Sequence, residues 1–149
     1  MSWNVRRFNC PVKVQACKEL VCSYKLEMVC ILEAKISQSV ASDPWFIQFH
    51  AIFDNEGSFN NFDVSSPGRM WLKWNASTLS FQPSFYSCQM VHGSLIYGPN
   101  SSCFISVVYA SNSYEDRLLL WHQIKDVVQN ALGPGLIMDD FNSCRSNFD

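Results

Sequence analysis

Six polar side chains stand where apolar segments of the sequence end, and their types could together carry out one reaction. They are Asn4, Glu33, Tyr109, Asn112, Asp140 and Asn142. A carboxylate such as Glu33 is a hard oxygen ligand that suits Mg²⁺, an ion that binds few carboxylates and keeps several waters. Asp140 could orient or deprotonate a water, while the amides and the phenol could hold a phosphate oxygen. The combination predicts metal-assisted phosphoester hydrolysis.

Each of these residues alone also has an ordinary structural explanation. A Glu that follows an apolar strand is usually the first solvated residue, and an Asp-x-Asn pair usually forms a turn. A Tyr at a strand end usually packs with its ring and solvates its hydroxyl. The hypothesis of a reaction centre therefore rests on the six residues together and on the elements that position them.

Apolar periodicity predicts those elements in the first half of the chain. They are a strand over 2–6, a helix over 11–24, and strands over 28–32 and 46–53. Pro11 is placed to open the helix, because proline fits the first helical position. Residues 54–67 are rich in Asn, Asp, Ser and Gly, which predicts a loop.

The second half of the chain predicts a run of strands followed by a helix and a last strand. The strands are predicted over 69–74, 79–81, 85–91, 103–110 and 136–139, and the helix over 114–131. The predicted breaks between strands are Pro83, Gly93 and Gly98-Pro99-Asn100. Ser113 and Asp116 form a capping box at the start of the helix. This order predicts a mixed α/β architecture in a single domain.

The composition excludes a disordered chain and one that holds nucleic acid by charge alone. Of 149 residues, 48% are hydrophobic and 14% aromatic, with 11 basic and 13 acidic side chains. A protein bound to nucleic acid purely by electrostatics would be basic. The charge is uneven, since residues 1–25 carry five basic side chains and one acidic one, and residues 74–149 carry three basic and six acidic ones.

Cysteine usage and the lack of long apolar runs predict an intracellular, non-secreted protein. The seven Cys are odd in number and contain no Cys-x-x-Cys pair, which argues against a disulfide framework and a zinc site. We expect most of them to be small buried hydrophobes. No apolar run is long enough to span a bilayer, and no obligate protein partner is evident.

Five ordered motifs include the candidate site residues. They are Ser2-Trp3-Asn4-Val5-Arg6, Leu32-Glu33-Ala34-Lys35, Gly68-Arg69-Met70-Trp71-Leu72-Lys73-Trp74-Asn75, Val107-Val108-Tyr109-Ala110-Ser111-Asn112 and Asp139-Asp140-Phe141-Asn142. Together they resemble the motifs of the endonuclease/exonuclease/phosphatase superfamily, most closely the endonuclease domain of plant non-LTR (LINE-type) retrotransposons. Leu32-Glu33-Ala34-Lys35 is similar to the family's Leu-Glu-Thr-Lys element, and Asp139-Asp140-Phe141-Asn142 to Gly-Asp-Phe-Asn. The resemblance covers residues 2 to about 145.

The resemblance implies a deoxyribonuclease I-like fold, in which two stacked mixed sheets carry helices on their outer faces. It also implies a role for each site residue. Glu33 would bind Mg²⁺, or Mn²⁺ in its place, with Asn4 beside it, and Asp140 would position the attacking water. The scissile phosphate would contact Tyr109, Asn112 and Asn142. The implied partner is DNA, and a nuclear location follows from the resemblance only.

The chain also departs from the family pattern. Family members end with a further sheet and a Ser-Asp-His element, whereas this chain ends seven residues after Asn142. We therefore expect one partial domain over 1–149, incomplete at its C-terminus, with exposed sheet edges prone to aggregation. Arg7 and Asp139 stand where the family has Gly, which predicts strain wherever that Gly has a positive φ. The three histidines, expected to be structural or solvated, are His50, His92 and His122.

Three hypotheses remain open on the sequence. The first is a Mg²⁺-dependent DNA endonuclease whose activity is weak or lost in this copy. The second is an inactive retroelement remnant or an interaction module that uses an aromatic such as Trp71 or Trp121, although core packing is the expected use of both. The third is a phosphomonoesterase of the same fold.

Overall fold

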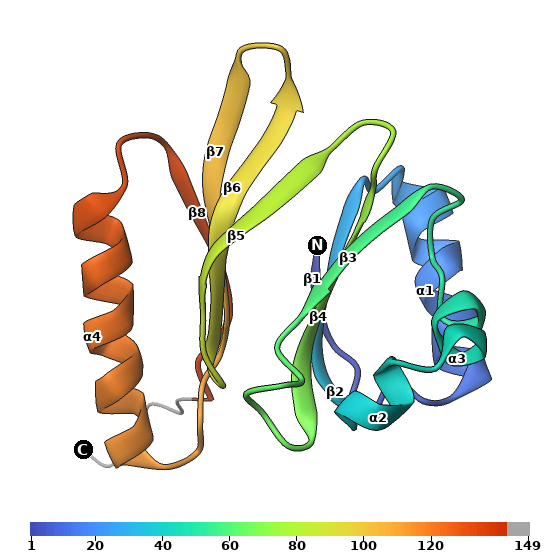
Figure 1. Cartoon of the computed structure of the whole chain (residues 1–149), viewed down its shortest axis with the longest axis horizontal. Coiled ribbons are helices and arrows are strands. Elements are labelled where there is room, and N and C mark those ends of the chain that lie inside the picture. Colours follow the sequence, from blue (N-terminus) through green and yellow to red (C-terminus); the bar gives the residue numbers. More distant parts are fainter. Residues whose placement is uncertain (143–149) are drawn as a thin grey trace, which may run out of the picture.

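Two four-stranded sheets face each other, and helices cover their outer faces (Figure 1). The structure is a computed structural model that describes residues 1–142. The first sheet has the order β1 (Ser2–Asn4), β2 (Met28–Ile36), β4 (Gly68–Asn75), β3 (Glu56–Asn60). The second has the order β5 (Ser80–Tyr86), β6 (Met90–Gly98), β7 (Ser101–Tyr109), β8 (Gly135–Asp140). The predicted two-sheet fold class is confirmed.

The helices are divided between the two sheets. On the outer side of the first sheet lie α1 (Pro11–Tyr24), α2 (Gln38–Ala41) and α3 (Pro44–Phe49). The long helix α4 (Tyr114–Asn130) covers the outer side of the second sheet (Figure 1). Helix α4 begins at the predicted cap, where the Ser113 side chain accepts a hydrogen bond from the Asp116 amide. Within residues 1–142, no helix is long and apolar enough to cross a membrane.

Strand β4 shows why the two sheets stack. Its residues alternate, so Met70 and Leu72 pack in the core between the sheets while Trp71 packs in the core beneath the helices of the first sheet. All three side chains are fully or almost fully buried. A strand with apolar side chains on both faces must be covered twice, which accounts for the layered architecture. Trp71 therefore has the predicted core role.

Two parallel strand pairs bring the ends of four strands to one side of the molecule. β1 runs parallel to β2, with Asn4 opposite Leu32, and β7 runs parallel to β8, with Tyr109 opposite Asp140. β1 also contacts β8, and β2 contacts β7, across the two sheets. The carboxyl ends of β1, β2, β7 and β8 therefore meet, as the placement of polar residues at strand ends predicts.

The predicted strand over 46–53 is wrong, because this segment starts as the short helix α3. Asp43 is its N-cap, with a side chain that accepts hydrogen bonds from the Trp45 and Phe46 amides, and Pro44 occupies the first turn. This Asp-Pro signal is typical of a helix start and outweighs the rough alternation that follows it. His50 thus follows a helix rather than lying in a strand, although its predicted structural role agrees with its burial.

The predicted loop over 54–67 contains an additional strand, β3. Among the residues that the structure describes, this strand pairs only with β4, as an edge strand of the first sheet. Its side chains are half-buried or exposed, so its composition is polar and resembles that of a loop. Glu56 in β3 forms an ion pair with Lys73 of β4, whose side chain is fully buried beneath it.

The predicted strand breaks at Pro83 and Gly93 are also wrong, because both residues lie inside strands. In the described part of the chain, β5 is an edge strand that pairs only with β6 and carries a bulge between Pro83 and Phe85, an arrangement that tolerates a residue without an N–H. Gly93 pairs with Pro83, and a Cβ on it would lie 2.3 Å from the Gln82 carbonyl oxygen. Glycine here permits a close backbone approach and does not end the strand.

Several side chains differ from their expected environments. Trp121, expected in the core, is half-exposed and stacks on Phe141 with ring centroids 5.1 Å apart. The expectation that most Cys are buried is wrong for the described part of the chain: Cys17 and Cys30 are buried, Cys10 and Cys103 are half-buried, and Cys22 and Cys88 are exposed. Cys144 lies outside the described residues. His92 is buried and bonded to Ser106, and His122 is exposed, as expected.

Candidate active site

The six predicted residues gather where the two sheets meet. A pocket of about 310 Å³ opens there, and its lining includes Glu33, Tyr109, Asn112 and Asn142. Asn4 and Asp140 lie beside it at the ends of β1 and β8. The site therefore combines side chains from both sheets, and two of them, Asn4 and Asp140, lie more than a hundred residues apart in sequence.

The side chain of Asn4 connects the two sheets. Its Nδ2 donates to Asp140 Oδ2 at 2.7 Å, and its Oδ1 accepts from the Arg6 amide at 3.2 Å. Because the backbone of Arg6 occupies the oxygen, the amide orientation is fixed and its N–H groups face Asp140. Asp140 therefore has a set position at the end of β8.

Glu33 is positioned by an irregular end of β2. The register with β4 shifts between Leu32 and Ile36, and Glu33 and Lys35 have positive φ angles of 55° and 54°. The chain after β1 stays bonded to this segment, since the Arg7 amide donates to the Glu33 carbonyl at 2.8 Å. The distortion is a bulge of the kind that redirects a side chain at the end of a strand.

The environment of Glu33 keeps it ionised. Burial alone would raise its pKa. The hydrogen bond and charge of Lys35, a hydrogen bond from Asn4 and the charge of Arg6 outweigh burial and hold the pKa of Glu33 below its usual value. Lys35 Nζ lies 2.6 Å from Glu33 Oε1. Glu33 is therefore a carboxylate at neutral pH, already paired with one cation.

Asn142 is held at the turn that follows β8. Its Nδ2 donates to the Ala110 carbonyl at 2.6 Å, and its backbone amide donates to Asp140 Oδ1 at 3.2 Å. Its φ of 46° is left-handed, a conformation that Asn tolerates better than most residues. The Asp-x-Asn segment thus forms a turn, as its ordinary explanation predicts, and this turn also aims Asn142 into the pocket.

The Tyr109 side chain is an uncharged phenol at neutral pH. Burial, followed by the negative charges of Glu33 and Asp140, raises its pKa above the usual value, against a hydrogen bond from Asn142 and the charge of Arg69. A phenol in this state can donate to a phosphate oxygen without carrying negative charge itself.

The loop that carries Asn112 is held by side chains from α4 and from the segment just before β6. Arg117 Nη1 donates to the Ser111 and Asn112 carbonyls at 3.0 and 2.8 Å. Gln89 accepts from the Ser111 amide at 2.7 Å. These bonds use backbone atoms, which leaves the Asn112 side chain to line the pocket.

The available donors fit Mg²⁺ better than a soft metal. Glu33 and Asp140 offer carboxylate oxygens, and Asn4 lies beside them, with its Nδ2 donating to Asp140 and its Oδ1 accepting from the Arg6 amide. Within residues 1–142, no group of three or more His, Cys, Asp or Glu could hold a metal ion on its own. A small set of hard oxygen ligands suits an ion that retains several waters, such as Mg²⁺.

Two positive side chains of the pocket were not among the predicted site residues. Lys35 and Arg69 both line it. The sequence pattern gives no signal for Arg69, because strand ranges alone do not state which strands pair. In the structure, Ile36 of β2 pairs with Gly68 of β4, directly before Arg69.

The two lost glycines have different consequences. Arg7 has a φ of 82°, so it adopts the conformation that glycine prefers. Asp139 is absent from the positive-φ residues and pairs with Val108 in regular strand register. The predicted strain therefore applies to Arg7 and not to Asp139.

A second, larger pocket lies away from these residues. It has a volume of about 390 Å³ and lies between α4 and the second sheet, where Phe85, Phe104 and Val127 supply apolar walls. His92 also lines it but is bonded through Nδ1 to Ser106. Since it contains none of the six residues at the strand ends, the smaller pocket is the better candidate for chemistry.

Solved structures share this fold at low sequence identity. A D. rerio TDP2 complexed with single strand DNA product is 11% identical, with a TM-score of 0.66, over 97% of this chain and 60% of that chain. The endonuclease domain of TRAS1, a telomere-specific non-LTR retrotransposon, is 12% identical, with a TM-score of 0.67, over 96% and 59%. The Xenopus laevis APE2 catalytic domain is 17% identical, with a TM-score of 0.63, over 95% and 57%.

These matches establish the deoxyribonuclease I-like fold. This chain spans about 60% of the length of the three structures. No protein-family model and no curated protein matches the sequence.

Proposed function

We propose that this chain is a Mg²⁺-dependent phosphodiesterase of the endonuclease/exonuclease/phosphatase superfamily that acts on DNA. The observation that carries the proposal is the hydrogen-bonded contact of Asn4 with Asp140, next to Glu33 and the polar pocket. It combines a metal ligand set, a group able to orient water and neutral phosphate donors at one place. The proposal includes Mn²⁺ as a substitute ion.

Each residue of the candidate site has its own role in the proposed reaction. Glu33, ionised at neutral pH, is the metal ligand, with Asn4 beside it. A bound divalent ion would polarise the phosphoryl group and stabilise the leaving oxygen. Asp140, held by Asn4 and by the Asn142 amide, orients the attacking water. The phosphate oxygens are held by Tyr109, Asn112 and Asn142.

DNA is the favoured substrate among phosphoesters. Two neighbours of the fold are described as an endonuclease of a non-LTR retrotransposon and as a complex with a single strand DNA product. The ordered motifs add the same indication for a retrotransposon-type endonuclease from a plant element. An enzyme that cuts chromosomal DNA would act in the nucleus, which we include in the proposal.

The second candidate is a weakly active enzyme or an inactive remnant, and two features of the structure favour it. The Lys35 ammonium lies 2.6 Å from Glu33, where it competes with a metal ion for the same carboxylate. The left-handed Arg6 and Arg7 add local strain near Asn4.

The decisive experiment is nicking of supercoiled plasmid by the full chain in Mg²⁺ or Mn²⁺. We expect slow nicking that EDTA abolishes and that Glu33→Gln and Asp140→Asn each reduce about a hundredfold or more, a usual cost of losing one key electrostatic group. Glu115→Gln, on the exposed first turn of α4, is the control and should nick at the wild-type rate. Equal nicking by all four proteins would indicate a contaminant and remove the proposal.

A further inference from the structure

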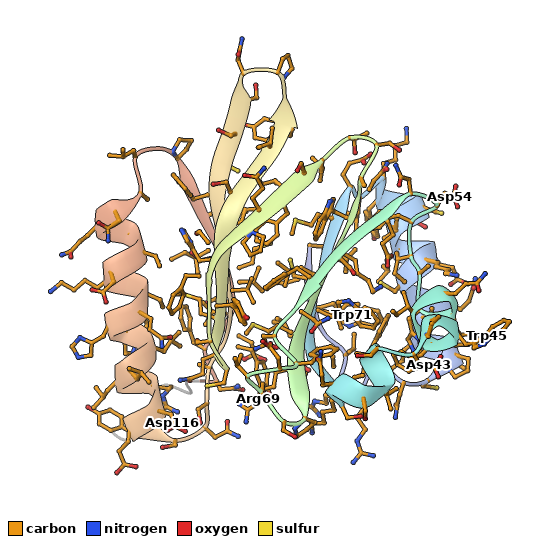
Figure 2. All side chains as sticks on the ribbon, viewed as in Figure 1. Asp43, Trp45, Asp54, Arg69, Trp71 and Asp116 are labelled. Carbon is orange, nitrogen blue, oxygen red and sulfur yellow. The ribbon has the colours of Figure 1, made fainter. Side chains whose placement is uncertain are left out.

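Arg69 is a charged side chain of the pocket to which the proposed chemistry assigns no role. It follows Gly68 at the start of β4, next to the end of β2 that carries Glu33. Figure 2 shows it between the two sheets, at the end where the site lies. Its side chain is half-buried, so it belongs to the wall of the pocket rather than to the open surface.

The guanidinium group of Arg69 is held without using its hydrogen-bond donors. Its Cζ lies 5.6 Å from the centre of the Tyr109 ring, within range of a cation–π contact. Within residues 1–142, the structure gives the group no ion pair, and no hydrogen bond of its side chain is found. Contact with the ring can thus position Arg69 while its N–H groups stay free.

The neighbouring cations differ in this respect. Lys35 is paired with Glu33, and Arg117 donates to the carbonyls of Ser111 and Asn112. Both charges are therefore committed to contacts within the protein, whereas the charge of Arg69 is available to a ligand.

An anionic ligand needs such a charge in this pocket. Glu33 and Asp140 are acidic and would repel a phosphate, and Tyr109, Asn112 and Asn142 are neutral. A guanidinium presents several N–H donors in a planar fork that matches two oxygens of one phosphate. Its contact with Tyr109 places this fork next to a second phosphate donor.

We propose that Arg69 is a phosphate-binding residue, whose guanidinium binds non-bridging oxygens of the same phosphate group that Tyr109 and Asn142 contact. The assignment deepens the proposed function and rests on it for the identity of the substrate. It gives the pocket a cationic side chain that holds a phosphodiester beside the Glu33 and Asp140 carboxylates.

The first test measures phosphate binding without a divalent ion and without catalysis. Protein with ¹³C-labelled tyrosine rings is titrated with inorganic phosphate and with dimethyl phosphate, and Tyr109→Phe identifies the Tyr109 signal. We expect saturable shifts of this signal, and affinity about tenfold or more weaker in Arg69→Gln, since a charge-assisted hydrogen bond is lost. Arg69→Lys, which keeps the charge but not the fork, should lie between the two.

Lys125→Gln supplies the matched control, because it removes one positive charge from the exposed surface of α4, remote from the pocket. It should bind phosphate as the wild type does. Equal affinity in Arg69→Gln, or no response of the Tyr109 signal in the wild type, would overturn the assignment. The near-UV circular dichroism of each variant checks that it is folded.

The second test separates this assignment from the proposed function. In the nicking assay, Arg69→Gln should lose about tenfold or more in kcat/KM, with a rise in KM. If the wild type nicks and Arg69→Gln nicks equally well, Arg69 is not a phosphate ligand and the nuclease proposal stands. If the wild type binds phosphate through Arg69 but does not nick, the residue assignment stands and the nuclease proposal fails.

Discussion

The hydrogen bond between Asn4 and Asp140 fixes two side chains of the candidate site at once. Asn4 accepts from the backbone of Arg6, which orients its Nδ2 toward the carboxylates, and this nitrogen donates to Asp140 at 2.7 Å. Because the two residues come from different sheets, a displacement of one sheet relative to the other would break the bond even if each sheet kept its own structure. The geometry of the site therefore depends on how the sheets stack.

The candidate site was largely predictable residue by residue, because all six side chains stand where apolar strands end. Their roles came from the family resemblance, and those roles stay a prediction. Arg69 was missed because it stands at the beginning of a strand, where sequence pattern gives no sign of a pocket. Only the pairing of β2 with β4 places it near Glu33.

His50 carries a pH dependence of stability. Its ring is buried and stacks on Phe46 with centroids 3.8 Å apart, and Nδ1 lies 2.8 Å from the Phe46 carbonyl oxygen. Burial is the main reason that its pKa lies below the ordinary 6.5, and burial does the same to His92. The unfolded chain thus binds more protons than the folded one between the lowered pKa values and 6.5.

Stability should therefore fall as the pH drops below about 6.5, and urea unfolding between pH 7 and about pH 5.5 would measure the slope. We expect His50→Gln and His92→Gln each to reduce this slope and the double variant to flatten it. A double variant that keeps the wild-type slope would show that other groups are responsible.

At the scale of elements, the segment after β1 combines strain with a backbone contact to the candidate site. Arg6 and Arg7 have φ angles of 46° and 82°, and the Arg7 amide bonds to the Glu33 carbonyl. An L-residue in the left-handed region costs about 1–2 kcal/mol. This conformation turns the chain from β1 toward α1 beside the irregular end of β2.

Arg7→Gly should stabilise the fold by about 0.5–1 kcal/mol, the relief of strain less the larger backbone entropy of glycine. The Arg7 side chain is exposed, so its removal costs little packing. The free energy of unfolding in urea measures the gain. The control is Lys18→Gly inside α1, where glycine should instead cost about 1 kcal/mol. A loss of stability in Arg7→Gly would contradict the argument.

The elements themselves were predictable to different degrees. Helices α1 and α4 start at Pro11 and after Ser113, as their capping signals predict. Helix α3 and strand β3 were missed because both are short and half-exposed, so neither has a long apolar period. Strand β5 passes through Pro83 because an edge strand needs hydrogen bonds on one side only.

At the scale of the whole molecule, the stacking of two sheets followed from the family resemblance and not from the periodicity. Apolar runs indicate buried strands, but they do not state which strands share a sheet. The order β1-β2-β4-β3 depends on contacts between residues far apart in sequence. The buried ion pair of Lys73 and Glu56 could not be predicted from the sequence pattern either, because a Lys inside a strand normally indicates a solvent-exposed face of the sheet.

Apolar side chains are exposed along β8 and the adjoining end of α4. Within residues 1–142, β8 pairs only with β7, and Leu136 and Ile137 are 53% and 42% exposed. Val128 on α4 is 57% exposed, and Leu132, which follows the helix, is 98% exposed. An edge strand with free backbone groups and exposed apolar side chains promotes association between chains. The expectation of exposed sheet edges is thus met most clearly at β8.

Ile137→Lys should reduce self-association, because a charged side chain on an edge strand opposes strand-to-strand pairing. The measurement is dynamic light scattering over a concentration series, together with the soluble fraction after heating. The control, Val12→Lys, adds the same charge on α1, where Val12 is 74% exposed but no sheet edge is formed. If the two substitutions reduce association equally, the effect does not depend on where the Lys is placed, and the edge of β8 is not the surface through which the chains associate. If only Ile137→Lys does so, the free edge of β8 is the surface through which the chains associate.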